Sequence, residues 1–475
     1  MTYIIVVVGV IVVLTTVTIF KMLGVKNQAD FMVAGRKLPW HVLVFTLLTS
    51  WIGAGSLFAG GENAYQNGFA ALWQPAGGWV GLIVIFFIAG RARRAAQFTL
   101  PDLLETRYNV VARALGTIAI VISYLMITSY QLKGGGDILH LIFPDVARDT
   151  GMYMIATFVI LFTASAGMAS VAYLDRVIGI TMTMSILVAF PWLVHNMGGW
   201  SKVTAALPAS HFAPLGTINI RQAFGFLLPT MLLLIGDQKM YQKFFSARSE
   251  KDARIAVGGW IIGTLILETL IIAVAVVGSA AFHPENAREI IPITARRGLP
   301  TLLGALLLGG IMGQLISTAN NHLFSPATNL IHDVYSRFIN PTASERKKLV
   351  ISRIIVIVLG IFAVLQATTF QSILGAALYA YTIYGASLTP VVLAVFFWKR
   401  ATAAGAIASI GLGTAVTVIW NVAGSPYGID AIFPALVISI VSLIGVSLIT
   451  PAPAKEKWAP FFEQAAEAKA AKARA

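Results

Sequence analysis

Six polar side chains lie mostly three or four residues apart in the apolar stretch 300–335. They are Gln314, Ser317, Thr318, Asn321, Ser325 and Thr328. This spacing puts them on one face of a helix, and their neutral oxygens are ligands of the kind that a small hard cation binds. Hydroxyls in membrane helices also bond to their own backbone, but six on one stripe predict a face that lines water or an ion.

Two other apolar stretches contain residues that interrupt a helix partway along. The stretch 38–61 has Gly53 and Gly55 among hydroxyl residues, and the stretch 222–245 has the polar run 236–239. Inside a bilayer, unwound backbone is tolerated only where it is buried in protein or lines a cavity. Its freed carbonyls can bind a cation, and paired interruptions are typical of carriers built from inverted repeats. Close helix packing would also explain the glycines alone.

Ionisable side chains also lie at membrane depth, where each is costly unless it is paired. They are Lys133, Asp137, Asp175, Asp237, Lys239 and Glu268. Lys133 and Asp137 are four residues apart and could form a buried ion pair, while Asp175 at the start of a predicted span could serve as a cap. Lys133 and Lys239 favour an anionic solute such as a carboxylate if they face the transport path.

The composition predicts the kind of element that positions these groups. Of the 475 residues, 57% are hydrophobic and 11% are charged, and the mean hydropathy is +0.80, whereas soluble domains carry about 25% charged residues. The absence of cysteine excludes disulfides and thiolate metal sites. A membrane span needs about 20 apolar residues, and the sequence predicts an all-α polytopic membrane protein of thirteen spans. The spans are 3–24, 38–61, 71–90, 112–142, 152–171, 175–195, 222–245, 253–282, 300–335, 349–368, 371–398, 402–423 and 429–450.

The positive charges between these stretches predict the orientation of the chain. With the N-terminus outside, 26 of the 34 Lys and Arg residues fall on the inside and 6 on the outside, which is positive-inside asymmetry. The net charge of +14 then reflects topology rather than a nucleic-acid partner. No Lys or Arg precedes Lys21, so we expect a retained first span rather than a signal peptide. We expect a multi-pass protein of the plasma membrane (a bacterial inner membrane), with the C-terminus inside.

Short motifs occur in order along nearly the whole chain. They are Asp30-Phe31 with Ala34-Gly35-Arg36, Thr99-Leu100-Pro101 with Arg107-Tyr108, Asp237-Gln238 with Gln242-Lys243 and Ser246-Ala247-Arg248, Ser317-Thr318 with Asp333-Val334-Tyr335, and Pro390 with Phe397-Trp398-Lys399-Arg400 and Gly405. In this order and at these depths the sequence resembles the solute:sodium symporter family, which includes sodium-coupled carriers of sugars, proline, sialic acid, pantothenate and monocarboxylates.

The resemblance implies a LeuT-like fold with two inverted repeats of five helices each. One extra helix precedes the repeats and two extra helices follow them. On this chain the parts would be 1–24, 25–200, 201–400 and 401–450, followed by a cytoplasmic tail, 451–475. The resemblance also implies a sodium site. Its ligands would be backbone oxygens of Thr49, Ile52 and Gln314 and the side chains of Ser317 and Thr318, with Asp175 as a further candidate.

We expect the solute to bind beside the interrupted helices. The candidate residues are Trp51, Ser56, Gln131, Lys133, Asp237, Gln238 and Tyr381. The resemblance argues against proline and sugars, because sodium/proline carriers have Asp at the position of Trp51 and some sugar carriers have an acid at that of Pro75. Together with the membrane lysines, this favours sodium-coupled symport of a small organic solute, such as a carboxylate or other anion, by alternating access. Sodium would be the coupling ion, with no other cofactor.

Several alternatives stay open at this point. Proton coupling through Asp175 or Glu268 would give pH dependence in place of sodium dependence. Asn320 and Asn321 stand where some members have hydroxyls for a second sodium ion, so the ion count is open. A transporter-like sensor would need an appended signalling domain, for which the tail is short. A membrane enzyme is disfavoured because we find no nucleophile motif, no paired carboxylates and no metal partner for the histidines of 300–335.

Overall fold

The protein is built from helices and connecting loops. The computed structural model describes residues 2–22, 33–95, 97–165 and 168–462, and these residues contain no β-strand. The longer helices are α1 (Thr2–Met22), α5 (Trp73–Ala95), α7 (Val110–Ile142), α8 (Arg148–Ser165), α9 (Met168–Asn196), α11 (Ile220–Gly236), α13 (Glu250–Ser279), α15 (Thr301–Asn329), α16 (Glu345–Ala367), α17 (Ile373–Ser387), α19 (Ala403–Val422) and α20 (Ile432–Ile449). The shorter helices are α3 (Trp40–Trp51), α4 (Gly60–Asn67), α6 (Leu100–Arg107), α10 (Trp200–Ala206), α12 (Gln238–Ser246), α14 (Ile290–Arg297) and α18 (Thr389–Phe397).

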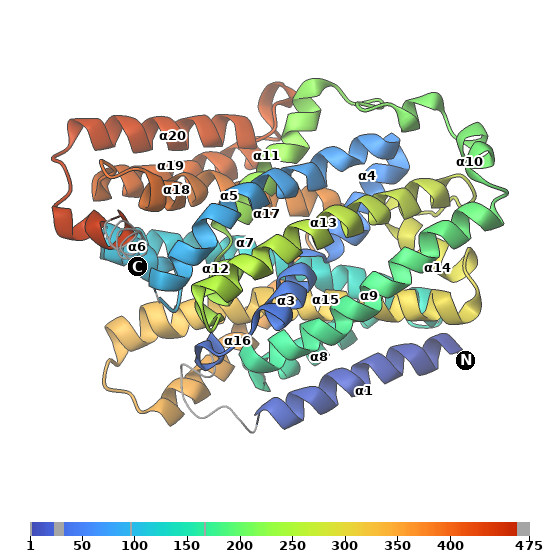
Figure 1. Ribbon diagram of the computed structural model, residues 1–475, viewed down its shortest axis with the longest axis horizontal. Coiled ribbons are helices and arrows are strands. Elements are labelled where there is room, and N and C mark those ends of the chain that lie inside the picture. The colour runs from blue at the N-terminus through green and yellow to red at the C-terminus, as the bar shows by residue number, and fades with distance from the viewer. Residues whose placement is uncertain (1, 23–32, 96, 166–167, 463–475) are drawn as a thin grey trace, which may run out of the picture.

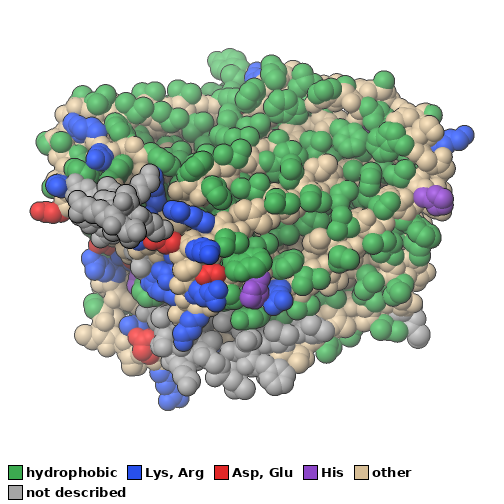
Figure 2. Space-filling view, viewed as in Figure 1, with side chains coloured by type: hydrophobic (Ala, Val, Ile, Leu, Met, Phe, Trp, Pro, Cys, Tyr) green, Lys and Arg blue, Asp and Glu red, His purple; other side chains and the backbone are tan. Residues whose placement is uncertain are grey.

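The exterior of the molecule is that of a membrane protein. Most long helices extend between the two ends of the longest axis (Figure 1). Hydrophobic side chains cover much of the visible face, and Lys and Arg side chains gather toward its left end (Figure 2). Within the described residues, ten helices are long and apolar enough to cross a membrane, and α3 and the first part of α1 are shorter apolar helices. The all-α membrane architecture is confirmed, whereas the number of thirteen spans is not.

The described chain starts and finishes at opposite ends of the bundle. α1 begins at the right end of the view, and α20 runs to the left end, on the side where the basic side chains gather (Figure 1). Any odd number of membrane crossings requires such an arrangement. The side of the membrane on which each terminus lies stays a prediction.

Two breaks interrupt the helical core within the stretches where the sequence predicts them. α3 ends where Ile52 takes an extended conformation (φ −71°, ψ 126°), and the chain resumes as a short π-helical segment, η2 (Gly55–Ala59), that continues into α4. Between α11 and α12, Asp237 is extended (φ −62°, ψ 107°), and its carboxylate accepts a hydrogen bond from the Lys239 N–H. The last carbonyls of α3 and α11 consequently have no N–H partner in a following helical turn.

α15 lies inside the bundle and packs against α1, α7 and α9. Small residues allow this close approach, because Gly309 faces Val6 of α1 and Gly313 faces Ile178 of α9. All of residues 307–329 are buried. The polar stripe predicted for this helix therefore faces protein rather than lipid.

The contact between α5 and α11 depends on a glycine. A Cβ added at Gly77 would collide with the backbone oxygen of Leu227. We expect Gly77→Ala to push the two helices apart and to lower the apparent melting temperature of the purified protein by several degrees. Gly258→Ala is the matched control, because nothing lies within 4 Å of the position of its Cβ and alanine favours a helix. Equal melting temperatures of the two variants would contradict this account.

Candidate functional site

The broken end of α3 meets the polar stripe of α15. The Thr318 hydroxyl donates hydrogen bonds to the backbone oxygens of Ile52 (3.0 Å) and Thr49 (3.3 Å). The side-chain amide of Gln314 donates to the same two oxygens. All four residues are buried. The structure thus brings together four of the predicted sodium-site residues from helices that are far apart in the sequence.

Ser317 and Asp175 extend this cluster toward α9. The Ser317 hydroxyl donates to one carboxylate oxygen of Asp175, and the Thr46 hydroxyl donates to the other. The Thr49 hydroxyl donates to the backbone oxygen of Asp175 (2.9 Å). Asp175 lies about two turns inside α9 and is fully buried, rather than capping the start of a span. All six predicted sodium-site residues therefore belong to one continuous cluster.

Lys243 of α12 balances the charge of Asp175. Its ammonium group lies 3.5 Å from Asp175 Oδ2, 2.9 Å from the Thr46 hydroxyl and 2.8 Å from the side-chain oxygen of Asn321. Neither charged side chain has exposed surface, and a buried charge without such a partner is costly. Lys243 was not predicted as a site residue, although it is four residues from Lys239 and thus on the same helical face.

The cluster has the donor chemistry of a sodium site. Two backbone carbonyls and two hydroxyls converge beside a carboxylate, and hard cations bind such oxygens. These oxygens belong to Thr49, Ile52, Ser317, Thr318 and Asp175. The residues present therefore fit an ion held between α3 and α15. Gln314 departs from the expectation of a backbone ligand, because it is its side-chain amide that contacts the cluster.

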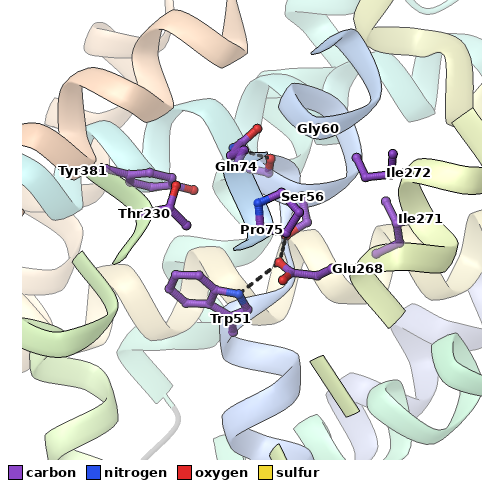
Figure 3. A pocket seen from close by; sticks show the side chains of 11 residues that line it. Trp51, Ser56, Gly60, Gln74, Pro75, Thr230, Glu268, Ile271, Ile272 and Tyr381 are labelled. Carbon is purple, nitrogen blue, oxygen red and sulfur yellow. Dashed lines mark hydrogen bonds between the residues drawn. The ribbon is translucent and has the colours of Figure 1, made fainter. Parts of the chain in front are cut away.

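A small pocket lies beside the α3 break (Figure 3). Its lining includes three of the predicted solute-binding residues, Trp51, Ser56 and Tyr381. The cavity measures about 20 Å³, which is room for a water molecule but not for an amino acid or a sugar. The lining side chains must therefore move apart before a solute enters.

Glu268 of α13 points into this pocket (Figure 3). Its Oε1 accepts hydrogen bonds from the Trp51 indole (3.0 Å) and the Ser56 hydroxyl (3.1 Å). Its Oε2 accepts no hydrogen bond of normal geometry, although the Trp79 indole lies near the carboxyl group. Among the described residues that line the pocket, none is Lys, Arg or His. Because a buried carboxylate is costly without a cation, Glu268 is suited to bind a cationic group or a proton.

Two other predicted solute-binding residues lie outside the pocket, on α7. Gln131 accepts a hydrogen bond from the Ala54 N–H (2.8 Å) and so supports the α3 break. Lys133 donates to two backbone oxygens at the connection from α16 to α17 (2.6 and 3.3 Å). It does not pair with Asp137, which binds Arg288 instead (2.8 Å). Neither residue is therefore in contact with a solute held in the pocket.

The last two candidates, Asp237 and Gln238, lie at the second break. The Tyr124 hydroxyl donates to the Asp237 carboxylate, and the Lys239 ammonium lies 2.9 Å from Asp237 and 2.8 Å from His322 Nε2. The Gln238 side chain accepts from a backbone N–H at the start of α6. These contacts tie the second break to α6, α7 and α15. Neither Asp237 nor Gln238 lines the pocket, although the Lys239 ammonium lies 5.9 Å from the ring centre of Trp51, which does.

A cluster of ion pairs lies where α6, α7 and the extension of α15 (η6, Leu330–Ile339) meet. Arg113 contacts Asp102 (2.8 Å), Glu105 and Asp333, and His332 Nε2 lies 3.0 Å from Asp102. Burial alone would raise the pKa of Asp102, but His332 and Arg113 outweigh it and hold the pKa below its ordinary value. Two carboxylates and the histidine could present ligand atoms to a metal. Arg113 already binds both carboxylates, so we interpret the group as an ion-pair lock.

Removing the guanidinium should open this lock, because three carboxylates would then repel one another. The chain has no cysteine, so a thiol placed at Ser325, on the buried stripe of α15, can report water access. We expect Arg113→Met to raise the rate at which Ser325→Cys reacts with a polar maleimide at least tenfold. Arg346→Met, at an exposed position of α16, is the control. Equal labelling rates in the two variants would show that the cluster does not close the end of the bundle where α6, α7 and η6 meet.

Comparisons with known proteins agree with this geometry. The model of the sodium:solute symporter family matches residues 31–413. The chain is 24% identical to the high-affinity proline transporter PutP of Bacillus subtilis, over 90% of this chain and 94% of that protein. It is also 24% identical to the sodium/proline symporter of Staphylococcus aureus, over 90% of this chain and 88% of that protein.

Solved structures share the fold. A sodium-coupled sialic acid symporter matches with a TM-score of 0.80 at 16% identity, over 95% of this chain and 99% of that one. Mhp1, a nucleobase-cation-symport-1 family transporter, matches with a TM-score of 0.59 at 10% identity, over 92% of this chain and 99% of that one. The predicted LeuT-like fold is thereby confirmed. The chain is a multi-pass membrane transporter, not an enzyme, and it belongs to the sodium:solute symporter family.

Proposed function

We propose that the protein carries proline, or a similar small amino or imino acid, together with sodium. The proposal rests on one observation: Glu268 is a buried carboxylate in the pocket, and no described residue of the lining has a cationic side chain. The primary ammonium group of an amino acid, or the secondary ammonium group of proline, would supply the missing positive charge through a charge-assisted hydrogen bond. The relatives in Bacillus and Staphylococcus, named for proline, agree with a solute of this kind.

The rest of the pocket suits the remaining parts of such a solute. The Tyr381 hydroxyl accepts a hydrogen bond from Tyr130 (3.2 Å), which leaves its own proton to donate to a carboxylate. Pro75, Ile271 and Ile272 supply an apolar wall for a small ring. A compact zwitterion with an apolar body would therefore meet a complementary group on each side.

An anionic solute, which the sequence favours, finds less support in the positions of the lysines. Lys133 is bound to backbone oxygens and Lys239 to Asp237 and His322, and neither lines the pocket. Sodium/proline carriers have Asp at the position of Trp51, and in this protein the Trp51 indole donates a hydrogen bond to Glu268. A carboxylate therefore reaches the same region from α13, and the argument against proline loses its force.

The coupling of ion and solute follows from their common border at the end of α3. The backbone oxygen of Ile52 faces the sodium cluster, while the side chain of the preceding residue, Trp51, binds Glu268 in the pocket. An ion that fixes the carbonyls would therefore also fix the pocket wall and favour solute binding. A membrane potential of 100 mV adds about 2.3 kcal/mol per charge moved, which corresponds to about 50-fold accumulation.

Glu268→Gln tests the role of the pocket carboxylate. Glutamine keeps the size and an acceptor for Trp51 and Ser56 but removes the charge, so we expect proline affinity to fall about 10- to 100-fold. The affinity for sodium alone should stay within a factor of two, because Glu268 is not in the sodium cluster. Glu345→Gln, at the exposed start of α16, is the control. Unchanged proline binding in Glu268→Gln would remove the basis of the proposal.

A solute panel in the wild-type protein separates the possible substrate classes. Ligand binding raises the apparent melting temperature, so proline should stabilise the protein in sodium, whereas cyclopentanecarboxylate, which lacks the nitrogen, should not. The reverse result would favour the anionic solute. Stabilisation by proline that depends on pH but not on the sodium concentration would instead favour proton coupling through Glu268.

Replacing both Ser317 and Thr318 by Ala tests the sodium site. The double variant removes the two hydroxyl ligands. We therefore expect the sodium concentration that gives half of the thermal shift to rise at least tenfold, and we expect sodium-driven uptake to be lost. Potassium and choline titrations report effects of ionic strength alone. A double variant that keeps the full sodium response would refute this assignment.

A further inference from the structure

The side chain of Gln314 lies where the proposed sodium site needs its ion. Its Nε2 donates to the backbone oxygens of both Thr49 and Ile52. Carbonyl oxygens only accept hydrogen bonds, so it is the nitrogen end of the amide that faces them. Because both carbonyls direct lone pairs at this nitrogen, the amide and a cation would compete for the same space.

The hydroxyl ligands of the site do not compete with an ion in this way. Thr318 donates to the same carbonyls and Ser317 donates to Asp175, but a hydroxyl can turn about its C–O bond and offer a lone pair to an ion. The amide nitrogen has no lone pair to offer. The whole carboxamide of Gln314 must therefore move, although only 1% of its surface is exposed.

The amide also has a use when no ion is bound. Buried carbonyls without a partner are costly, above all at membrane depth. Together with the Thr318 hydroxyl, the two hydrogen bonds of Gln314 satisfy both carbonyls and hold the broken end of α3 against α15. They thereby limit separation of the two helices in the ion-free protein.

We propose that the Gln314 carboxamide is a built-in competitor of sodium. It binds the carbonyls of Thr49 and Ile52 when the ion is absent, and it swings away when sodium binds. It therefore sets the sodium affinity lower than the oxygen ligands alone would give. This inference rests on the sodium site proposed above and assigns a role to a side chain that the ligand set does not include.

Gln314→Ala in the purified full-length protein tests this competition without a transport assay. We expect the ion-free melting temperature to fall, because two hydrogen bonds are lost. We expect the sodium concentration that gives half of the thermal shift to fall about tenfold, because the competitor is gone. Gln314→Glu is a second variant, since a carboxylate cannot donate to the carbonyls but can bind the ion, and it should also tighten sodium binding. Gln66→Ala, at an exposed position of α4, is the matched control.

The possible outcomes separate this inference from the proposed function. Weaker sodium binding in Gln314→Ala would overturn the inference, because Gln314 would then be a ligand through its oxygen. Unchanged binding would overturn it as well, because the amide would not be in the path of the ion. If Ser317 and Thr318 prove necessary for the sodium response in either case, the sodium site stands and only the competition fails. A wild-type protein with no sodium response would reject both.

Discussion

Unwound backbone at membrane depth must find partners inside the protein, and the break at Ile52 imposes this demand on the core. The polar stripe of α15 meets it, because Thr318 and Gln314 donate to the freed carbonyls. This explains why a helix rich in amides and hydroxyls lies buried among α1, α7 and α9 rather than against lipid. The same break places Trp51 and Ser56 around Glu268. One constraint therefore puts the oxygen cluster between α3 and α15 next to the pocket that contains Glu268.

The balance of buried charges distinguishes structural groups from groups that await a ligand. Asp175 has Lys243, and Asp237 has Lys239, so each of these carboxylates carries its own cation. Glu268 has only neutral donors among the described residues. Since a buried carboxylate needs a cation or a proton, the unbalanced group is the one that a transported solute would complete. Lys243 and Lys239, in contrast, are already paired with these carboxylates and have little attraction left for an anion.

The helix breaks could be predicted from local signals, because glycines and polar residues interrupt the apolar stretches 38–61 and 222–245. The hydroxyls on one face of 300–335 were also visible locally, but the ligand set of the proposed sodium site came from the family resemblance. The sequence did not predict the partners of the buried charges, because these come from distant helices. Asp175 meets Lys243 of α12, and Asp137 meets Arg288 rather than the lysine four residues before it. Spacing along one helix fixes which residues share a face, but not what packs against that face. The role of Glu268 depended on such a neighbour, the Trp51 indole.

α7 connects the parts of the structure that alternating access must move together. Arg113 near its start belongs to the ion-pair lock, and Asp137 near its end binds Arg288, about 36 Å farther along the helix. Between them, Tyr124 contacts the second break and Gln131 contacts the first. A rigid helix with these four contacts cannot tilt at one end without disturbing both breaks and the other end. If α7 tilts against α15, an opening at one end would be exchanged for a closure at the other, and an ion held between α3 and α15, as proposed, would bias that exchange.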